Sequence, residues 1–256
     1  MGRIVAISNQ KGGVGKTTTA VNLAASIAVA EQRVLLIDLD PQGNASSGVG
    51  VVEREGPKSV YPLFFAEATI DDVKQSTELP YLDVVAGSRD VAGVEIELVD
   101  DPDRATRLRD AVEAVRDQYD WIFLDCPPSL GILTINALSA ADVVLVPMQA
   151  EYYALEGLSD LVGTIERVRS TLNPKLALHG VLLTMFDGRN NLSNQVADEV
   201  RKHFHVFDTV IPRNVRLAEA PSYGRPVILY DAGSRGSHGY LNLAREILEH
   251  QTAPAA

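Results

Sequence analysis

The sequence predicts an α/β fold in which helices flank a central, mostly parallel, twisted sheet within a single domain. Short apolar, β-branched stretches alternate along the chain with longer stretches of helical apolar spacing. The short stretches are almost continuously apolar, as is typical of strands buried on both faces of a parallel sheet. No linker rich in Pro, Gly and Ser interrupts this alternation. We therefore expect one domain, residues 1–250, and a short disordered tail, residues 251–256.

The first elements form one crossover unit. Residues 3–8, RIVAIS, and residues 33–40, RVLLIDLD, are short apolar runs that each end in polar residues. The Ala- and Leu-rich stretch 16–32 lies between them and has the spacing of a helix. A strand, loop, helix and strand in this order imply a right-handed crossover between parallel strands.

The same alternation continues to the end of the chain. Further strands are predicted at residues 81–87, 120–128, 142–149 and 178–186. Further helices are predicted at residues 104–118, 155–172, 192–204 and 240–250. Residues 41–60 form the longest loop-like stretch and directly follow a predicted strand, which is where open α/β sheets bind their ligands.

The composition excludes several classes of protein. The single cysteine, Cys126, rules out an intrachain disulfide and any metal site that needs two cysteines. No stretch approaches the roughly 18 to 20 apolar residues of a membrane span. The N-terminus runs straight into a strand pattern and lacks the layout of a signal peptide. We therefore expect a cytoplasmic protein.

Charge is distributed unevenly along the sequence. The formal net charge of −11 argues against a protein that coats nucleic acid over its whole surface. Residues 51–120 hold 17 Asp and Glu against 8 Lys and Arg, whereas residues 180–225 hold 6 Lys and Arg against 5 Asp and Glu. A local basic patch is therefore compatible with the C-terminal third.

The segment 9–19, NQKGGVGKTTT, matches a phosphate-binding loop with one departure. The usual pattern is a Gly, four residues and then Gly-Lys-Ser/Thr, and Gln10 stands where the first glycine is expected. Lys16 is expected to reach the β- and γ-phosphates of a nucleotide, and the Thr17 hydroxyl to bind Mg²⁺. Lys11 is a second lysine, five residues earlier. One lysine is enough to hold the phosphates, so Lys11 needs a separate explanation.

The residues between the two lysines are expected to present backbone donors. They are Gly12, Gly13, Val14 and Gly15. Glycines between a strand and a helix let the backbone curl so that several N–H groups point at one anion, and the helix N-terminus adds its partial positive charge. This loop predicts a nucleotide-binding site.

Aspartates end two of the predicted strands. Asp125 ends the strand WIFLD in a Walker-B arrangement and is expected to bind Mg²⁺ directly or through water. Asp38 and Asp40 end the strand 33–40 and share one face of it. Asp40, at the start of the next loop, is the better placed to orient an attacking water. A lone aspartate at a strand end is usually a turn former, but two beside a phosphate-binding loop favour a metal and water site.

Five segments, in this order and spacing, resemble the ParA/Soj branch of the deviant Walker-A ATPases, which belong to the MinD superfamily. The segments are KGGVGKTT (11–18), LLIDLDPQGNAS (35–46), FLDCPPSLGILTINAL (123–138), QAEYYALEGLSDL (149–161) and TVIPRNVRLAEAPSYGRPVILYD (209–231). The resemblance covers nearly the whole chain. It implies a three-layer P-loop fold and a Mg²⁺-dependent ATPase that binds ATP and ADP.

The resemblance also implies a role for each matching residue. Lys11 is expected to cross a homodimer interface and contact the nucleotide of the other subunit, and Gly12 to lie where the two chains come closest. The implied catalytic residues are Lys11, Lys16 and Asp40, and the implied metal-binding residues are Thr17, Asp40 and Asp125. The implied nucleotide contacts are Gly12, Gly13, Val14, Gly15, Lys16, Thr17 and Thr18 in the loop, and Pro212, Arg213 and Asn214 against the adenine.

DNA contacts are implied at positively charged residues of the C-terminal third. Arg189 and Arg216 match positions that the family uses to bind DNA non-specifically. Arg201 and Lys202 are further candidates near the end of a predicted helix, where the negative end of the helix also accounts for cations. A lone arginine is most often a solvated surface residue or half of a weak ion pair. Both explanations stay open for these four residues.

The implied function is DNA segregation. ATP closes the homodimer, the dimer binds double-stranded DNA, hydrolysis releases it, and a ParB-like centromere-binding partner stimulates hydrolysis. A lysine supplied by the partner subunit acts like an arginine finger on the transferred phosphoryl group. The expected location is the cytoplasm, on the nucleoid and without membrane contact, and the target is a chromosome or a plasmid.

Relatives with the same loop give the alternatives. An iron-protein-like reductase and an arsenite-pump ATPase need more cysteines than one, and a tyrosine kinase of this loop type needs a tyrosine-rich tail. A MinD-like ATPase that cycles on membranes needs a basic amphipathic C-terminal helix, whereas residues 240–256 hold one Arg and two Glu. A metabolic P-loop ligase stays open, because sequence alone reveals a small substrate pocket poorly.

Overall fold

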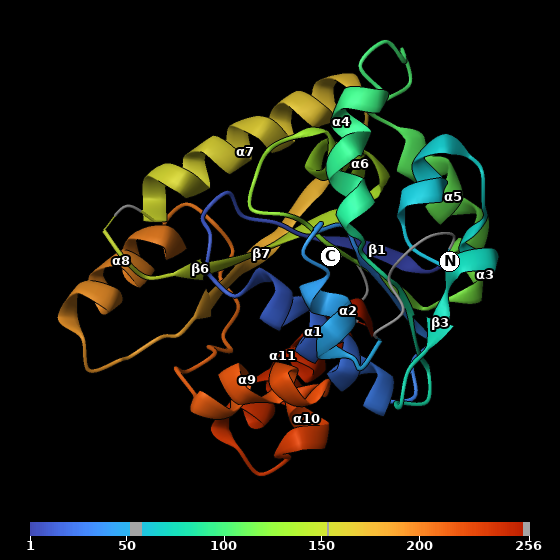
Figure 1. Ribbon diagram of the computed structural model, residues 1–256. Helices are drawn as coiled ribbons and strands as arrows, with labels where there is room; N and C mark the ends of the chain where they lie inside the picture. Colours follow the sequence, from blue (N-terminus) through green and yellow to red (C-terminus); the bar gives the residue numbers. More distant parts are fainter. Residues whose placement is uncertain (52–57, 153, 253–256) are drawn as a thin grey trace.

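One twisted sheet runs through the part of the chain that the computed structural model describes, residues 1–51, 58–152 and 154–252 (Figure 1). Its strands are β1 (Arg3–Ile7), β2 (Val34–Asp38), β3 (Gln75–Ser76), β4 (Leu82–Val85), β5 (Trp121–Asp125), β6 (Val143–Gln149) and β7 (Ala177–Thr184). Within this part, the short β3 is antiparallel to β4 and every other strand pair is parallel. The predicted α/β fold is confirmed.

The strand order brings three strand ends together. The order is β3-β4-β2-β5-β1-β6-β7, so β5 lies between β1 and β2. Asp125, the last residue of β5, is in register with Ile7 of β1 on one side and with Asp38 of β2 on the other. The phosphate-binding loop, the Walker-B aspartate and the segment after Asp38 therefore leave the sheet together, at the carboxyl ends of its strands.

Helices cover both faces of the sheet, giving three layers (Figure 1). One face is covered by α1 (Lys16–Val29) and α11 (Arg235–Thr252), and the other by α5 (Arg107–Val115), α6 (Ile132–Ala140), α7 (Ala154–Thr171) and α8 (Asn191–Arg201). The shorter helices are α2 (Asn44–Gly48), α3 (Ile70–Val73), α4 (Val94–Glu97), α9 (Val215–Glu219) and α10 (Val227–Tyr230), with 3₁₀ turns at Tyr61–Phe65, Arg89–Gly93, Arg116–Gln118 and Ala220–Tyr223.

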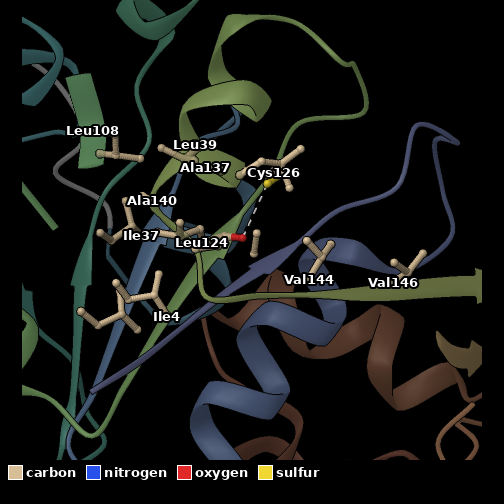
Figure 2. Packing of buried hydrophobic residues seen from close by; sticks show 14 of the residues in the cluster. Ile4, Ile37, Leu39, Leu108, Leu124, Cys126, Ala137, Ala140, Val144 and Val146 are labelled. Atoms are coloured by element: carbon tan, nitrogen blue, oxygen red, sulfur yellow. Dashed lines mark hydrogen bonds between the residues drawn. The ribbon is translucent and has the colours of Figure 1, made fainter. Parts of the chain in front are cut away.

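Two apolar clusters lie on the two sides of the sheet, because successive side chains of each strand point to opposite faces. Figure 2 shows part of the larger one, in which Ile4, Ile37, Leu124 and Val144 come from four adjacent strands and pack near Ala137 of α6. Cys126 lies in the same cluster, fully buried, with its Sγ 3.8 Å from the Leu124 carbonyl oxygen. Cys126 is therefore a packing residue beside the site.

The predicted elements are found with shifted ends. The strand expected at 33–40 ends at Asp38, and the helix expected at 104–118 ends as a 3₁₀ turn. The prediction of loop for residues 41–60 is wrong over α2, and residues 52–57 lie outside the described residues. The last helix continues through Thr252, past the expected domain end. Residues 253–256 are not described, so the tail stays a prediction.

Candidate nucleotide-binding site

The loop between β1 and α1 has a backbone that requires glycine at two positions. Gly13 has φ +74° and Gly15 has φ +89°, in the left-handed region that residues with a Cβ rarely adopt. The Thr184 hydroxyl at the end of β7 donates a 2.7 Å hydrogen bond to the carbonyl oxygen of Val14. The loop is thus held from β7, two strands away from β1, while α1 begins at Lys16 and directs its N-terminal N–H groups toward the loop.

Lys16 points back into this loop. Its side chain is buried, and Nζ donates a 3.1 Å hydrogen bond to the carbonyl oxygen of Lys11. Burial lowers the pKa of Lys16, and the negative charge of Asp125 opposes that shift. An ammonium held among backbone groups and partly removed from water is placed to bind an anion in the loop.

The Asp125 carboxylate is buried, and no hydrogen-bond donor among the described residues reaches it. Neither of its carboxylate oxygens has a hydrogen-bond partner among the described residues, although both are buried. Burial raises the pKa of Asp125 well above its usual range, the negative charge of Asp38 raises it further, and interaction with the Thr17 hydroxyl opposes the rise. Buried carboxylate oxygens without partners suit a hard cation. The donor set of Asp125 and Thr17 therefore fits Mg²⁺ held jointly with nucleotide phosphates.

Asp38 and Asp40 differ in what surrounds their carboxylates. Asp38 is fully buried and accepts hydrogen bonds from the backbone N–H and the hydroxyl of Ser46 and from the backbone N–H of Asp40. Burial raises the pKa of Asp38 to about 6. The Asp40 carboxylate is half-buried and accepts from the backbone N–H of Gln42 at 2.9 Å. This difference supports Asp40 as the carboxylate that faces a reacting group.

A cavity of about 360 Å³ adjoins the start of α1. Pro212, Arg213 and Asn214, the predicted adenine contacts, line it together with Gly15 from the loop and Thr18 from the start of α1. Its apolar wall comes from residues that the sequence did not single out, Met185, Ile211, Leu217 and Tyr240. Met185 directly follows β7, Ile211 precedes α9, Leu217 lies on α9 and Tyr240 on α11, so no local pattern in the sequence marks them as one surface.

Lys11 projects away from the loop that contains it. Its Nζ lies 2.5 Å from Oε2 of Glu151, and both side chains are about half exposed. Its backbone N–H donates to the Asn9 side chain at 3.0 Å. A Cβ built on the neighbouring Gly12 has no described atom within 4 Å. This part of the loop therefore faces open space, and Glu151 is a partner that sequence analysis missed.

The four candidate DNA contacts are exposed or partly exposed and each pairs with a carboxylate of its own chain. Arg189, in the loop between β7 and α8, is 91% exposed in its side chain and lies 3.0 Å from Asp187. The other pairs are Arg201 with Asp198 at 3.3 Å, Lys202 with Glu199 at 2.6 Å, and Arg216 with Glu219 at 2.8 Å and Asp231 at 3.1 Å. Among the described residues, each of these cations has its own carboxylate partner and none is linked to another, so a shared DNA-binding surface stays a prediction.

Two further findings bear on the site. Over residues 1–51, 58–152 and 154–252, no three His, Cys, Asp or Glu side chains gather as a metal site. Mg²⁺ bound with nucleotide phosphates needs only one or two carboxylates, so this finding is compatible with the predicted site. Within the same residues, no helix combines the length and apolar character that crossing a membrane requires.

Comparison with known proteins shows the family. The family model described as AAA domain matches residues 2–178. The chromosome partitioning protein ParA of Myxococcus xanthus is 54% identical over 98% of this chain and 90% of its own length. The sporulation initiation inhibitor protein Soj of Bacillus subtilis is 55% identical over 96% of this chain and 98% of its own length.

Solved structures agree with the fold. The cell division ATPase MinD of Pyrococcus furiosus superposes with a TM-score of 0.81 at 26% identity, covering 98% of this chain and all of that one. A cobyrinic acid a,c-diamide synthase of Mycobacterium smegmatis, solved with ADP and magnesium, superposes with a TM-score of 0.86 at 32% identity, covering 99% and 96%. With the identity to partition proteins and the phosphate-binding loop, the chain belongs to the ParA/Soj family of chromosome-partitioning proteins, P-loop ATPases of the MinD superfamily.

Proposed function

We propose that this protein is a Mg²⁺-dependent ATPase that forms a homodimer on binding ATP, binds double-stranded DNA non-specifically in that state, and drives segregation of a chromosome or plasmid. A ParB-like centromere-binding protein is its proposed stimulating partner, and the nucleoid in the cytoplasm its proposed location. Family membership supports the partition role. The main observation in support of the homodimer is that the Lys11 side chain points away from its own phosphate-binding loop.

Lys16 and the loop backbone are the proposed phosphate ligands. The Lys16 ammonium exchanges the Lys11 carbonyl oxygen for the β- and γ-phosphate oxygens of ATP, and the N–H groups from Gly12 to Thr18 donate to the phosphates. Thr17 and Asp125 would hold Mg²⁺, which would supply positive charge against the developing charge on the phosphates. Pro212, Arg213 and Asn214 hold the adenine in the 360 Å³ cavity.

Asp40 is the proposed group that orients the attacking water. It follows β2, which is separated from β1 by β5 alone, so its carboxylate enters from the side opposite to the base cavity. The backbone of Asp40 is held by the Asp38 carboxylate, which leaves the Asp40 side chain as the adjustable acceptor. Orienting water for in-line attack is mainly a matter of position.

Lys11 is proposed to act on the nucleotide of a second copy. Lys16 already fills its own loop, whereas Lys11 Nζ lies outside it, on Glu151. The open space beside Gly12 lets another chain approach the loop closely. When the Lys11 ammonium leaves Glu151 and binds a phosphate of the nucleotide in the other subunit, dimerisation and hydrolysis become one event.

DNA binding is proposed to use Arg189 and Arg216, with Arg201 and Lys202 as additional contacts. Exposed ion pairs contribute little to stability, so DNA phosphates are able to replace the carboxylates that these cations contact. Joining two such surfaces in a dimer strengthens weak binding through effective concentration. An acidic protein is thus able to bind DNA in only one nucleotide state.

The test is DNA binding measured with ATP and with ADP across a salt series. We expect binding with ATP that weakens steeply as salt rises, because phosphate contacts release counterions. Equal binding in ATP and ADP contradicts the proposal. Sedimentation with anionic liposomes under the same conditions tests the MinD-like alternative, and ATP-dependent sedimentation without DNA binding favours it.

A further inference from the structure

The Asp38 carboxylate joins the two ends of the turn that carries Asp40. Its Oδ1 accepts the backbone N–H of Asp40 at 3.1 Å. Its Oδ2 accepts both the backbone N–H of Ser46 at 2.8 Å and the Ser46 hydroxyl at 2.7 Å. Asp38 is fully buried in the sheet, so it forms a rigid anchor for both ends of the turn.

Ser46 extends this anchor to a third segment. Its hydroxyl oxygen accepts the backbone N–H of Gly87 at 3.0 Å, just after β4, while its proton is donated to Asp38. Ser46 is fully buried. A Cβ placed on Gly87 would lie 2.7 Å from the Asp40 carbonyl oxygen and 3.0 Å from the Asp38 Cγ. The segment after β4 therefore packs directly against the backbone of Asp40.

The turn itself is closed around Asp40. The backbone N–H of Gly43 donates to the Asp40 carbonyl oxygen at 2.9 Å, and the backbone N–H of Gln42 donates to the Asp40 carboxylate at 2.9 Å. Gly43 has φ +62°, which lets the chain reverse into α2 and bring Ser46 back to Asp38. The position of the Asp40 carboxylate is thus set by a network whose far end is the Ser46 hydroxyl.

We propose that Ser46 is a positioning residue for ATP hydrolysis, which acts through Asp38 and Gly87 to place the Asp40 carboxylate. The inference rests on the proposed role of Asp40. Among the described residues, the Ser46 hydroxyl bonds Asp38 and Gly87, and Ser46 does not line the base cavity, so we expect its loss to change the catalytic step and leave nucleotide affinity as it is. A purely structural hydroxyl would change the melting temperature and leave kcat unchanged.

The test compares two substitutions of equal shape. Ser46→Thr keeps the hydroxyl, and Ser46→Val replaces it with a methyl group. With DNA, ATP and Mg²⁺, we expect Ser46→Val to lower kcat about tenfold or more relative to Ser46→Thr, because small displacements of a reacting group slow catalysis strongly. KM for ATP and the affinity for a fluorescent ATP analogue should stay equal in the two variants.

Ser139→Ala is the matched control. The Ser139 hydroxyl is also buried and donates to the Asn136 carbonyl oxygen at 2.9 Å, on α6 rather than on the turn that carries Asp40. We expect its kcat to match that of the unaltered protein. If Ser46→Val does not fold, Ser46→Ala takes its place against Ser46→Thr.

Equal kcat in the hydroxyl-bearing and hydroxyl-free variants overturns the proposal. So does a parallel loss of kcat and nucleotide affinity, since that indicates general damage to the site. Asp40→Ala separates the two levels of inference. Normal turnover in Asp40→Ala refutes the role of Asp40 itself, whereas an inactive Asp40→Ala beside a fully active Ser46→Val refutes only the role of Ser46.

Discussion

Lys11 and Glu151 lie 140 residues apart in the sequence, and their side chains meet at 2.5 Å beside the phosphate-binding loop. Glu151 follows β6, the strand next to β1, so the sheet brings the pair together. The contact holds the additional lysine within its own chain. On the proposed role of Lys11, dimerisation would begin with the loss of this ion pair.

Lys11→Ala should keep nucleotide binding and lose ATP-dependent dimerisation, because Lys16 rather than Lys11 lies within the loop. Size-exclusion chromatography with light scattering in ATP, together with binding of a fluorescent nucleotide, measures both properties. Lys74→Ala is the control, since Lys74 pairs with Asp71 on a distant surface at 2.6 Å. Dimers that persist in Lys11→Ala would refute the role of this lysine.

Glu151→Gln should allow dimers to form at lower ATP concentration, because Lys11 no longer exchanges a carboxylate for a phosphate. Titration of ATP against dimer fraction measures the shift, for which we expect a severalfold decrease in the half-maximal concentration. Glu166→Gln is a matched control, since Glu166 is equally exposed and pairs with Arg169 at 3.0 Å. A half-maximal concentration that rises in Glu151→Gln would show that Glu151 supports the dimer instead.

Asp40→Ala should bind ATP and hold the dimer on DNA while turnover falls about 100-fold or more, the usual scale for loss of a group that acts on the reacting water. Single-turnover ATP hydrolysis and dissociation of DNA after dilution measure the two effects. Asp90→Ala, which removes an exposed carboxylate after β4, should behave like the unaltered protein. Turnover at the normal rate in Asp40→Ala would exclude the proposed role.

Arg189→Glu should lose DNA binding and still dimerise, whereas Asp187→Asn should bind DNA severalfold more tightly at low salt. Asp187 contacts the Arg189 guanidinium at 3.0 Å, so its charge competes with DNA phosphates. Fluorescence anisotropy with labelled duplex DNA in ATP measures both variants. Arg169→Glu, on α7, is the control for the change of charge. Unchanged DNA affinity in Arg189→Glu would place the DNA-binding surface elsewhere.

Asp125→Asn should stabilise the nucleotide-free protein at neutral pH. Burial and Asp38 raise the pKa of Asp125, so the folded unaltered protein holds its proton more tightly than the unfolded chain and loses stability as pH rises through that range. The variant does not titrate there. Its advantage in melting temperature should be about 2 °C or more at pH 7 and shrink toward pH 4. A constant difference across pH would contradict the cause assigned here.

The central strands and the phosphate-binding loop could be predicted because their signals are local. Continuous apolar runs that end in Asp38 and Asp125 identify buried strands and their exits, and the spacing from Gly12 to Lys16 identifies the loop. The short β3 and α6 carry weaker signals. Antiparallel β3 has two residues, and α6 has no distinct polar face because its polar residues Thr134, Asn136 and Ser139 are buried as well, which hides its helical periodicity.

The remaining parts of the site depend on contacts between distant residues. Glu151, Ser46 and Tyr240 acquire their places only when the sheet is assembled, so no spacing in the sequence marks them. Tyr152 departs from a general tendency of its position. Aromatic residues at the start of a helix usually pack inside, but Tyr152 is 73% exposed, and Tyr153 lies outside the described residues.

The order of strands across the sheet also separates charge. The acidic stretch 51–120 supplies β3 and β4 at one edge, and the nearly balanced stretch 180–225 supplies most of β7 and the following loop with Arg189 at the other. Negative charge is therefore concentrated toward the β3 edge of the sheet. If the protein binds DNA as proposed, the field of a duplex would turn the β7 edge toward it before any contact forms. Strand order would thus give an acidic protein an orientation of approach.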